Sequence, residues 1–155
     1  MDDLIKELEA QEARLLFDRF DNDDAWALGC LLVETAKERG LGITIDIRRG
    51  GQQLFHAALP GTAPDNDRWI ERKIRVVERL HNSSYLVGRR LDARGKTFDA
   101  GYGVDPADYA THGGAFPVRV RNVGVVGVVT VSGLPQADDH ALVVEVLEQF
   151  LGQVS

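Results

Sequence analysis

Hydrophobic and polar residues alternate most regularly in two stretches of this chain, and each stretch predicts a β-hairpin. In residues 43–48 (ITIDIR) an isoleucine occupies every second position, which is the period-two pattern of a half-buried strand. A tight turn at Arg49-Gly50-Gly51 and a returning strand over residues 53–59 complete the first hairpin. We expect the isoleucines to face the core, and Asp46 with its polar neighbours Thr44 and Arg48 to face solvent.

The second hairpin lies in residues 116–134 (FPVRVRNVGVVGVVTVSGL). Val118 and Val120 alternate with arginines, and Asn122 then supplies a residue type that tolerates the left-handed backbone of a turn. The valine-rich run that follows predicts a central strand buried on both faces. Gly127 interrupts this run, which indicates a bulge or the close approach of another backbone segment.

Helical periodicity and end signals predict five helices around the hairpins. One helix has cap-type side chains and carboxylates at its start, from Asp21 to Asp24, and ends at Gly40. Its apolar face is widened by Trp26, so we expect this helix to be largely buried. Residues 15–20 (LLFDRF) favour a further strand, which gives the order αβαββααββα. The predicted helices cover residues 2–13, 21–39, 67–80, 85–93 and 138–151.

The element order and the composition together predict one α+β domain over residues 1–155, with an antiparallel sheet and helices on both faces. The net charge of −6 argues against nucleic acid or an anionic membrane as a partner. The acidic N-terminal residues lack the pattern of a signal peptide, and no apolar run approaches the roughly 18 residues of a transmembrane helix. We therefore expect a cytoplasmic protein. Cys30 is the only cysteine, which excludes an internal disulfide.

The junction after the valine-rich strand is the best candidate binding site. Ser132-Gly133 ends a buried strand just before a helix begins, and free backbone N–H groups in such a turn favour a carboxylate or a phosphate. An ordinary strand-to-helix turn has the same sequence pattern and stays an open alternative. A basic helix supplies Lys73, whose stem we expect to lie along Trp69 with its amine at a pocket mouth. A solvated helix face is the alternative for those basic residues.

The histidines add candidates of a different kind. Residues 99–115 are rich in glycine and lack periodicity, which is typical of a functional loop, and this loop carries His112-Gly113-Gly114. An exposed loop histidine is the alternative interpretation of His112. His56 lies in a strand and is a candidate if it faces solvent, whereas His140 follows two aspartates, which we interpret as helix-start electrostatics. The histidine spacings indicate no metal site, and without a catalytic motif the question of enzymatic activity stays open.

Several motifs carry a family resemblance: IDIR at 45–48, AALPG at 57–61, HGGAFP at 112–117, GVVTVSGL at 127–134, and Asp138-Asp139-His140. They resemble the HbpS/GlcG-like family, also called the haem-degrading domain family, and its uncharacterised small cytosolic subgroup most of all. The resemblance spans most of the chain. It implies a profilin-like α/β/α sandwich with a five-stranded antiparallel sheet. It also implies homo-oligomers built from dimers, and an association with haem or another small ligand.

These patterns leave three functional hypotheses. The first is a homo-oligomeric protein that binds a small, anionic molecule. The second is a haem-binding or haem-degrading protein, with His56, His112 or His140 approaching the iron. The third is a structural or adaptor oligomer without a ligand, which has less need of a polar, glycine-rich loop. The predicted ligand-binding residues are Lys73, His112, Gly113, Gly114, Ser132, Gly133 and His56.

Overall fold

The structure is a computed structural model that describes residues 3–154, with side chains described up to residue 152. The helices are α1 (Asp3–Arg14), α2 (Asn22–Arg39), α3 (Pro64–Leu80), α4 (Ser84–Ala93), α5 (Phe98–Tyr102) and α6 (Gln136–Val154). The strands are β1 (Thr44–Arg49), β2 (Gln52–Ala58), β3 (Ala115–Val120) and β4 (Gly124–Ser132).

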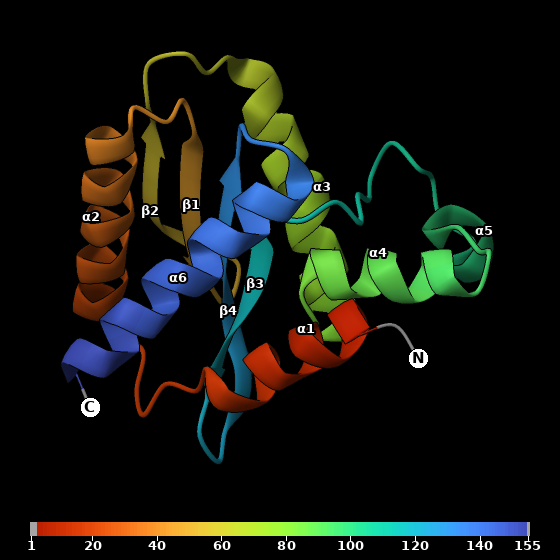
Figure 1. Cartoon of the computed structure of the whole chain (residues 1–155), viewed down its shortest axis with the longest axis horizontal. Helices are drawn as coiled ribbons and strands as arrows, with labels where there is room; N and C mark the ends of the chain where they lie inside the picture. Colours follow the sequence, from red (N-terminus) through yellow and green to blue (C-terminus); the bar gives the residue numbers. More distant parts are fainter. Residues whose placement is uncertain (1–2, 155) are drawn as a thin grey trace.

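The strands form one antiparallel sheet in the order β2-β1-β4-β3, so the two hairpins join through β1 and β4. Helices α2 and α6 cover one face of the sheet and α3 covers the other (Figure 1). The expected α+β fold, with an antiparallel sheet and helices on both faces, is confirmed. The larger core lies under α2 and α6, where the isoleucines of β1 pack, and a smaller core lies under α3.

The prediction of five strands is wrong, because residues 15–20 form a single β-bridge and the described sheet has four strands. Phe17 pairs in parallel with Val120, and its backbone makes hydrogen bonds of 2.8 Å with Arg119 and Arg121. The segment is short, because α1 ends just before it and the N-cap of α2 follows it directly. Leu15, Phe17 and Phe20 are buried in the core, so burial fixes this segment more than strand pairing does.

The expectation that Thr44 and Asp46 face solvent is also wrong, since their exposed fractions are 0% and 1%. A period-two pattern assumes one solvated face, but here α3 covers the polar side of β1. The Asp46 carboxylate accepts hydrogen bonds from Arg48 Nε at 3.0 Å and from Gln53 Nε2 at 2.6 Å. These bonds offset the cost of burying its charge.

Trp26 does not join the buried face of α2, because its side chain is 63% exposed. Its indole packs edge to face on Phe55 of β2, with ring centroids 5.4 Å apart, at the outer edge of the sheet. Leu28 and Leu32 on the same helix are fully buried, and Cys30 is half-buried. The helical period alone does not define how wide the buried face is.

Other local signals are confirmed by the structure. Asp21 and Asp24 form a capping box at the start of α2. Asn122 has a φ of +65° in the turn between β3 and β4. Gly127 lies so close to β1 that a Cβ atom would meet the backbone oxygen of Arg48 at 2.2 Å. These features depend on neighbouring residues or on one steric constraint, so the sequence predicts them well.

Candidate functional site

A pocket of about 270 Å³ lies where β4 ends and where α3 and α6 both begin. Figure 1 shows the starts of both helices at the same end of the sheet, beside the end of β4. The first turns of two helices therefore border one cavity, and each contributes partial positive charge. The pocket is lined by Asp65, Asn66, Trp69, Lys73, His112, Gly113, Ser132, Gly133, Leu134, Gln136 and Asp139.

Five of the seven predicted ligand-binding residues line this pocket: Lys73, His112, Gly113, Ser132 and Gly133. They come from α3, from the loop before β3 and from the end of β4, so only the fold brings them together. Their role in binding stays a prediction.

The other two predicted residues lie outside the lining. Gly114 lies behind the pocket wall, where a Cβ atom would be 2.7 Å from Lys73 Nζ and 2.4 Å from the backbone oxygen of Val131. His56 lies on β2, where its Nε2 is 2.7 Å from Asp67 Oδ1. Gly114 thus leaves room for the lysine amine, whereas His56 forms a separate pair on the surface.

The centre of the site is an ion pair between Lys73 and Asp139, each only 2% exposed. Lys73 Nζ lies 3.3 Å from Asp139 Oδ2 and donates a hydrogen bond of 3.1 Å to the backbone oxygen of Val131. Sequence reasoning missed Asp139 as a partner, because its position near the start of α6 favoured a purely local role. The lysine lies 66 residues away in the sequence, and no local pattern joins the two.

Asp139 also occupies the backbone N–H groups that we expected to be free for a ligand. Gly133 N donates to Asp139 Oδ2 at 3.4 Å, and Leu134 N donates to Asp139 Oδ1 at 3.0 Å. The turn therefore already holds an anion, which is the protein's own carboxylate. A ligand in this pocket must use the lysine, the serine hydroxyl and the first turns of the helices instead.

Burial shifts both members of the pair towards their neutral forms. Burial raises the pKa of the Asp139 carboxyl to about 6, although Lys73 and the two backbone donors act in the opposite direction. Burial likewise lowers the pKa of the Lys73 ammonium, and the Asp139 carboxylate opposes that shift. Both shifts bring the pKa values of the two groups closer together than those of an exposed lysine and aspartate.

An aromatic pair forms one wall of the pocket. The rings of Trp69 and His112 meet nearly edge to face, with centroids 5.0 Å apart. The guanidinium of Arg72 lies 4.6 Å from the centre of the Trp69 ring and donates a hydrogen bond of 3.0 Å to the backbone oxygen of Pro106. The basic helix α3 thus holds the loop in place.

Burial lowers the pKa of His112, with further lowering by Lys73 and Arg72, so its imidazole is neutral at pH 7.

His140 lies behind the pocket rather than in it. It is 4% exposed, and its Nε2 lies 2.7 Å from Gln11 Oε1. Its Cβ would be 3.2 Å from a Cβ placed on Gly113, so the glycine allows the loop to pack against α6. Within residues 3–154, no group of three or more histidine, cysteine or acidic side chains is arranged to hold a metal ion.

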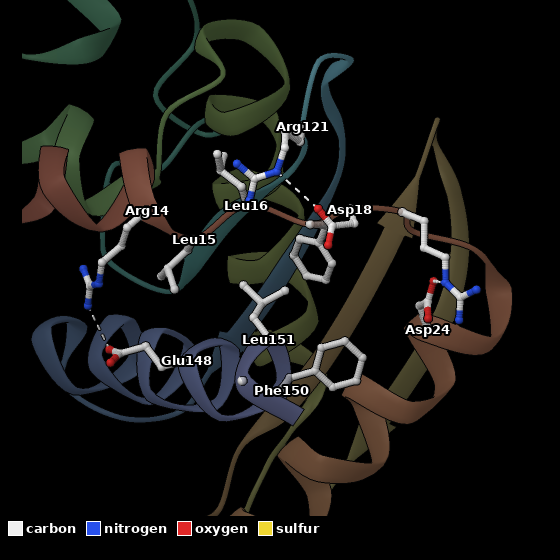
Figure 2. Close-up of a pocket in the computed structure, with 12 residues that line it drawn as sticks. Arg14, Leu15, Leu16, Asp18, Asp24, Arg121, Glu148, Phe150 and Leu151 are labelled. Atoms are coloured by element: carbon white, nitrogen blue, oxygen red, sulfur yellow. Dashed lines mark hydrogen bonds and ion pairs between the residues drawn. The ribbon is translucent and has the colours of Figure 1, made fainter. Parts of the chain in front are cut away.

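A larger pocket, of about 700 Å³, lies elsewhere, between the end of α1, residues 15–19 and the end of α6. Figure 2 shows its charged rim, where Arg14 pairs with Glu148 at 3.1 Å and Arg121 with Asp18 at 3.2 Å. The predicted site residues all lie outside this pocket. Its arginines are paired with carboxylates of the same rim, so it has no excess of charge for a ligand.

No helix within residues 3–154 is long and apolar enough to cross a bilayer.

The chain is similar to proteins of known family. It is 66% identical to the UPF0303 protein SCO2848 of Streptomyces coelicolor over 149 residues, which are 96% of this chain and 94% of that protein. It is 33% identical to the protein in the crystal structure of Ybr137w, with a TM-score of 0.90 and coverage of 97% of this chain and 90% of that one.

A more distant neighbour is the crystal structure of a PduOC–haem complex, with 14% identity and a TM-score of 0.70. The likeness covers 83% of this chain and 93% of that one. This likeness shows a common fold alone. Residues 20–148 match the model of the family described as haem degrading protein HbpS-like. The chain therefore belongs to the HbpS-like family.

Proposed function

We propose that this protein binds a small molecule in the pocket around Lys73 and Asp139. The buried ion pair that opens into this pocket carries the proposal. Removing two charges from water costs several kcal/mol, and apolar residues in such a place often give equal or greater stability. Two titratable groups with shifted pKa values in a cleft are, by contrast, typical of a functional site.

The arrangement favours a small ligand with one negative charge. A lysine ammonium has three N–H groups, and Val131 and Asp139 accept two of them, which leaves one for a ligand acceptor. The Ser132 hydroxyl and the first turns of α3 and α6 add further favourable interactions. Because Asp139 already balances the charge of Lys73, a multiply charged phosphate is less suitable than a monocarboxylate.

The intrinsic fluorescence of Trp69 provides a direct test. The chain has two tryptophans, and Trp26 is exposed and outside the pocket lining, so W26F leaves Trp69 as the reporter. We expect small monocarboxylates to change Trp69 emission in W26F, and K73M to abolish that response. Native mass spectrometry of the protein as purified will show any ligand it retains. No retained mass and no response to any carboxylate would instead support a structural or adaptor protein.

Haem is the second candidate, suggested by the family and by the haem complex of PduOC. The residues of a single chain do not fit it well. The pocket is slightly below the range of about 300–1,000 Å³ for drug-sized ligands, and His112 is its only lining histidine. His56 is already hydrogen-bonded to Asp67, and His140 is hydrogen-bonded to Gln11. Haem titration of H112A and H56A tests this candidate: an unaltered Soret band in H112A removes His112 as the ligand.

We also propose that the protein forms a homo-oligomer in the cytoplasm. The outer strand β2 has a neighbour on one side only, and the exposed Trp26 lies against it. Unpaired strand edges and large exposed aromatic side chains are features that proteins commonly cover with another chain.

A further inference from the structure

The amine of Lys73 has an unusual position for a lysine. Its side chain begins on α3 and reaches the end of β4, where Nζ is held between the backbone oxygen of Val131 and the carboxylate of Asp139. Although it is only 2% exposed, it lines the pocket. The amine is therefore largely shielded from water but lies within reach of a small molecule in the cavity.

Burial of this amine favours its neutral, nucleophilic form. Asp139 Oδ2 lies 3.3 Å away and can accept one of the ammonium protons. Burial lowers the pKa of Lys73 and raises that of Asp139 to about 6, so both shifts favour this proton transfer. Desolvated lysines in pockets are the groups that proteins use to form Schiff bases with carbonyl compounds.

We propose that Lys73 reversibly captures a small aldehyde or 2-oxo acid as an imine, with Asp139 as the proton carrier. This inference rests on the proposed binding function and names the chemical class of its ligand. Asp139 first accepts a proton from the Lys73 ammonium, and the neutral Nζ then attacks the carbonyl carbon while the carbonyl π electrons move to oxygen. Asp139 returns its proton to the resulting alkoxide and takes a second proton from the nitrogen, which gives the neutral carbinolamine. Asp139 then protonates the hydroxyl group, which leaves as water while the nitrogen lone pair forms the C=N bond of a protonated imine. Hydrolysis reverses these steps, and no oxidant or reductant is needed.

The rest of the site fits a carbonyl compound that also carries a carboxylate. Gly114 leaves space beside the amine, since a Cβ atom at that position would lie 2.7 Å from Nζ. Ser132 and Asn66 line the pocket, and Asn66 Nδ2 lies 3.4 Å from Ser132 Oγ, so the two provide donors for a ligand oxygen. The first turn of α6 at Gln136 favours the carboxylate.

Borohydride trapping with glyoxylate tests this proposal on the intact protein. Reduction of the imine fixes a carboxymethyl group on the reacting amine, and peptide mapping then locates it. The chain has four lysines, Lys6, Lys37, Lys73 and Lys96, so the competing sites are few. We expect limiting glyoxylate to label Lys73 ahead of the other three. The adduct should be lost in K73R and retained in K37R, whose lysine is exposed.

Equal labelling of all four lysines, or labelling that spares Lys73, overturns the proposal. The result from the wild-type chain decides the question even if K73R folds poorly. Glycolate, which has no carbonyl group, separates this proposal from the binding function. A response of Trp69 in W26F to glycolate, without a trapped adduct at Lys73, leaves the binding site intact and rejects the imine. No response to either compound and no adduct reject both.

Discussion

His140 is a buried histidine whose protonation the fold opposes. Its ring lies near those of Tyr85 and Phe116, with centroids 5.1 Å and 5.9 Å away, and its Nε2 contacts Gln11 Oε1. Burial lowers its pKa from 6.5 to about 4. Between those two values the unfolded chain binds a proton that the folded chain does not, so this histidine reduces stability as the pH falls through that range.

We therefore expect the free energy of unfolding to fall by about 2–3 kcal/mol between pH 7 and pH 4.5 through His140 alone. Carboxylates add their own acid dependence, so the measurement is a comparison. Urea denaturation of the wild type and of H140Q at pH 7, 5.5 and 4.5 should give a shallower loss of stability in H140Q. Parallel losses in the two proteins contradict the prediction.

The ion pair between Lys73 and Asp139 can be tested by the stability of single and double variants. Removing one member of a buried ion pair leaves an uncompensated charge, so we expect K73M to lose about 3–5 kcal/mol of stability. In K73M/D139N that charge is absent, and the double variant should be more stable than the sum of the two single losses by about 1–3 kcal/mol. Denaturant unfolding of the four proteins measures this coupling. Additive losses would show that the two side chains are independent.

At the scale of the elements, the β1–β4 pairing depends on the missing side chain of Gly127. A Cβ atom there would meet the backbone oxygen of Arg48 at 2.2 Å, and backbone cannot move away as a flexible side chain can. We expect G127A to lose about 1–3 kcal/mol in denaturant unfolding. Gly101 in α5 has open space around its Cβ position, so G101A is the matched control and should change stability by less than about 1 kcal/mol. Equal effects of the two substitutions contradict this account of the strand pairing.

The elements also show which parts of the fold a sequence can predict. The start of α2 was predictable because its capping box joins residues only three positions apart. The irregular connection at residues 15–20 was not predictable, because its apolar residues fit either a strand or a buried connection. The burial of Asp46 depends on α3, which packs over the sheet from a distant part of the chain. The pocket was predicted in part for the same reason: its loop and turn have local signals, whereas the pairing of Lys73 with Asp139 does not.

At the scale of the whole molecule, the end of the sheet formed by β2 and α2 is the surface most suited to a second copy of the chain. Trp26 is 63% exposed there, and β2 is paired only with β1 in the described sheet. Val123 is exposed to a similar extent, 70%, but it lies at the tip of the turn between β3 and β4. A charge placed in the interface between two copies of the chain disfavours their association, whereas a charge at a solvated turn has little effect on it.

We expect the wild type to be a homo-oligomer by native mass spectrometry, and W26D to shift it towards smaller assemblies. V123D is the matched control and should keep the assembly of the wild type. A smaller assembly in V123D, with W26D unchanged, would move the interface to the opposite hairpin. A monomeric wild type would contradict the expected oligomer altogether. The pocket would then have to work within one chain, because all the side chains that line it come from a single copy.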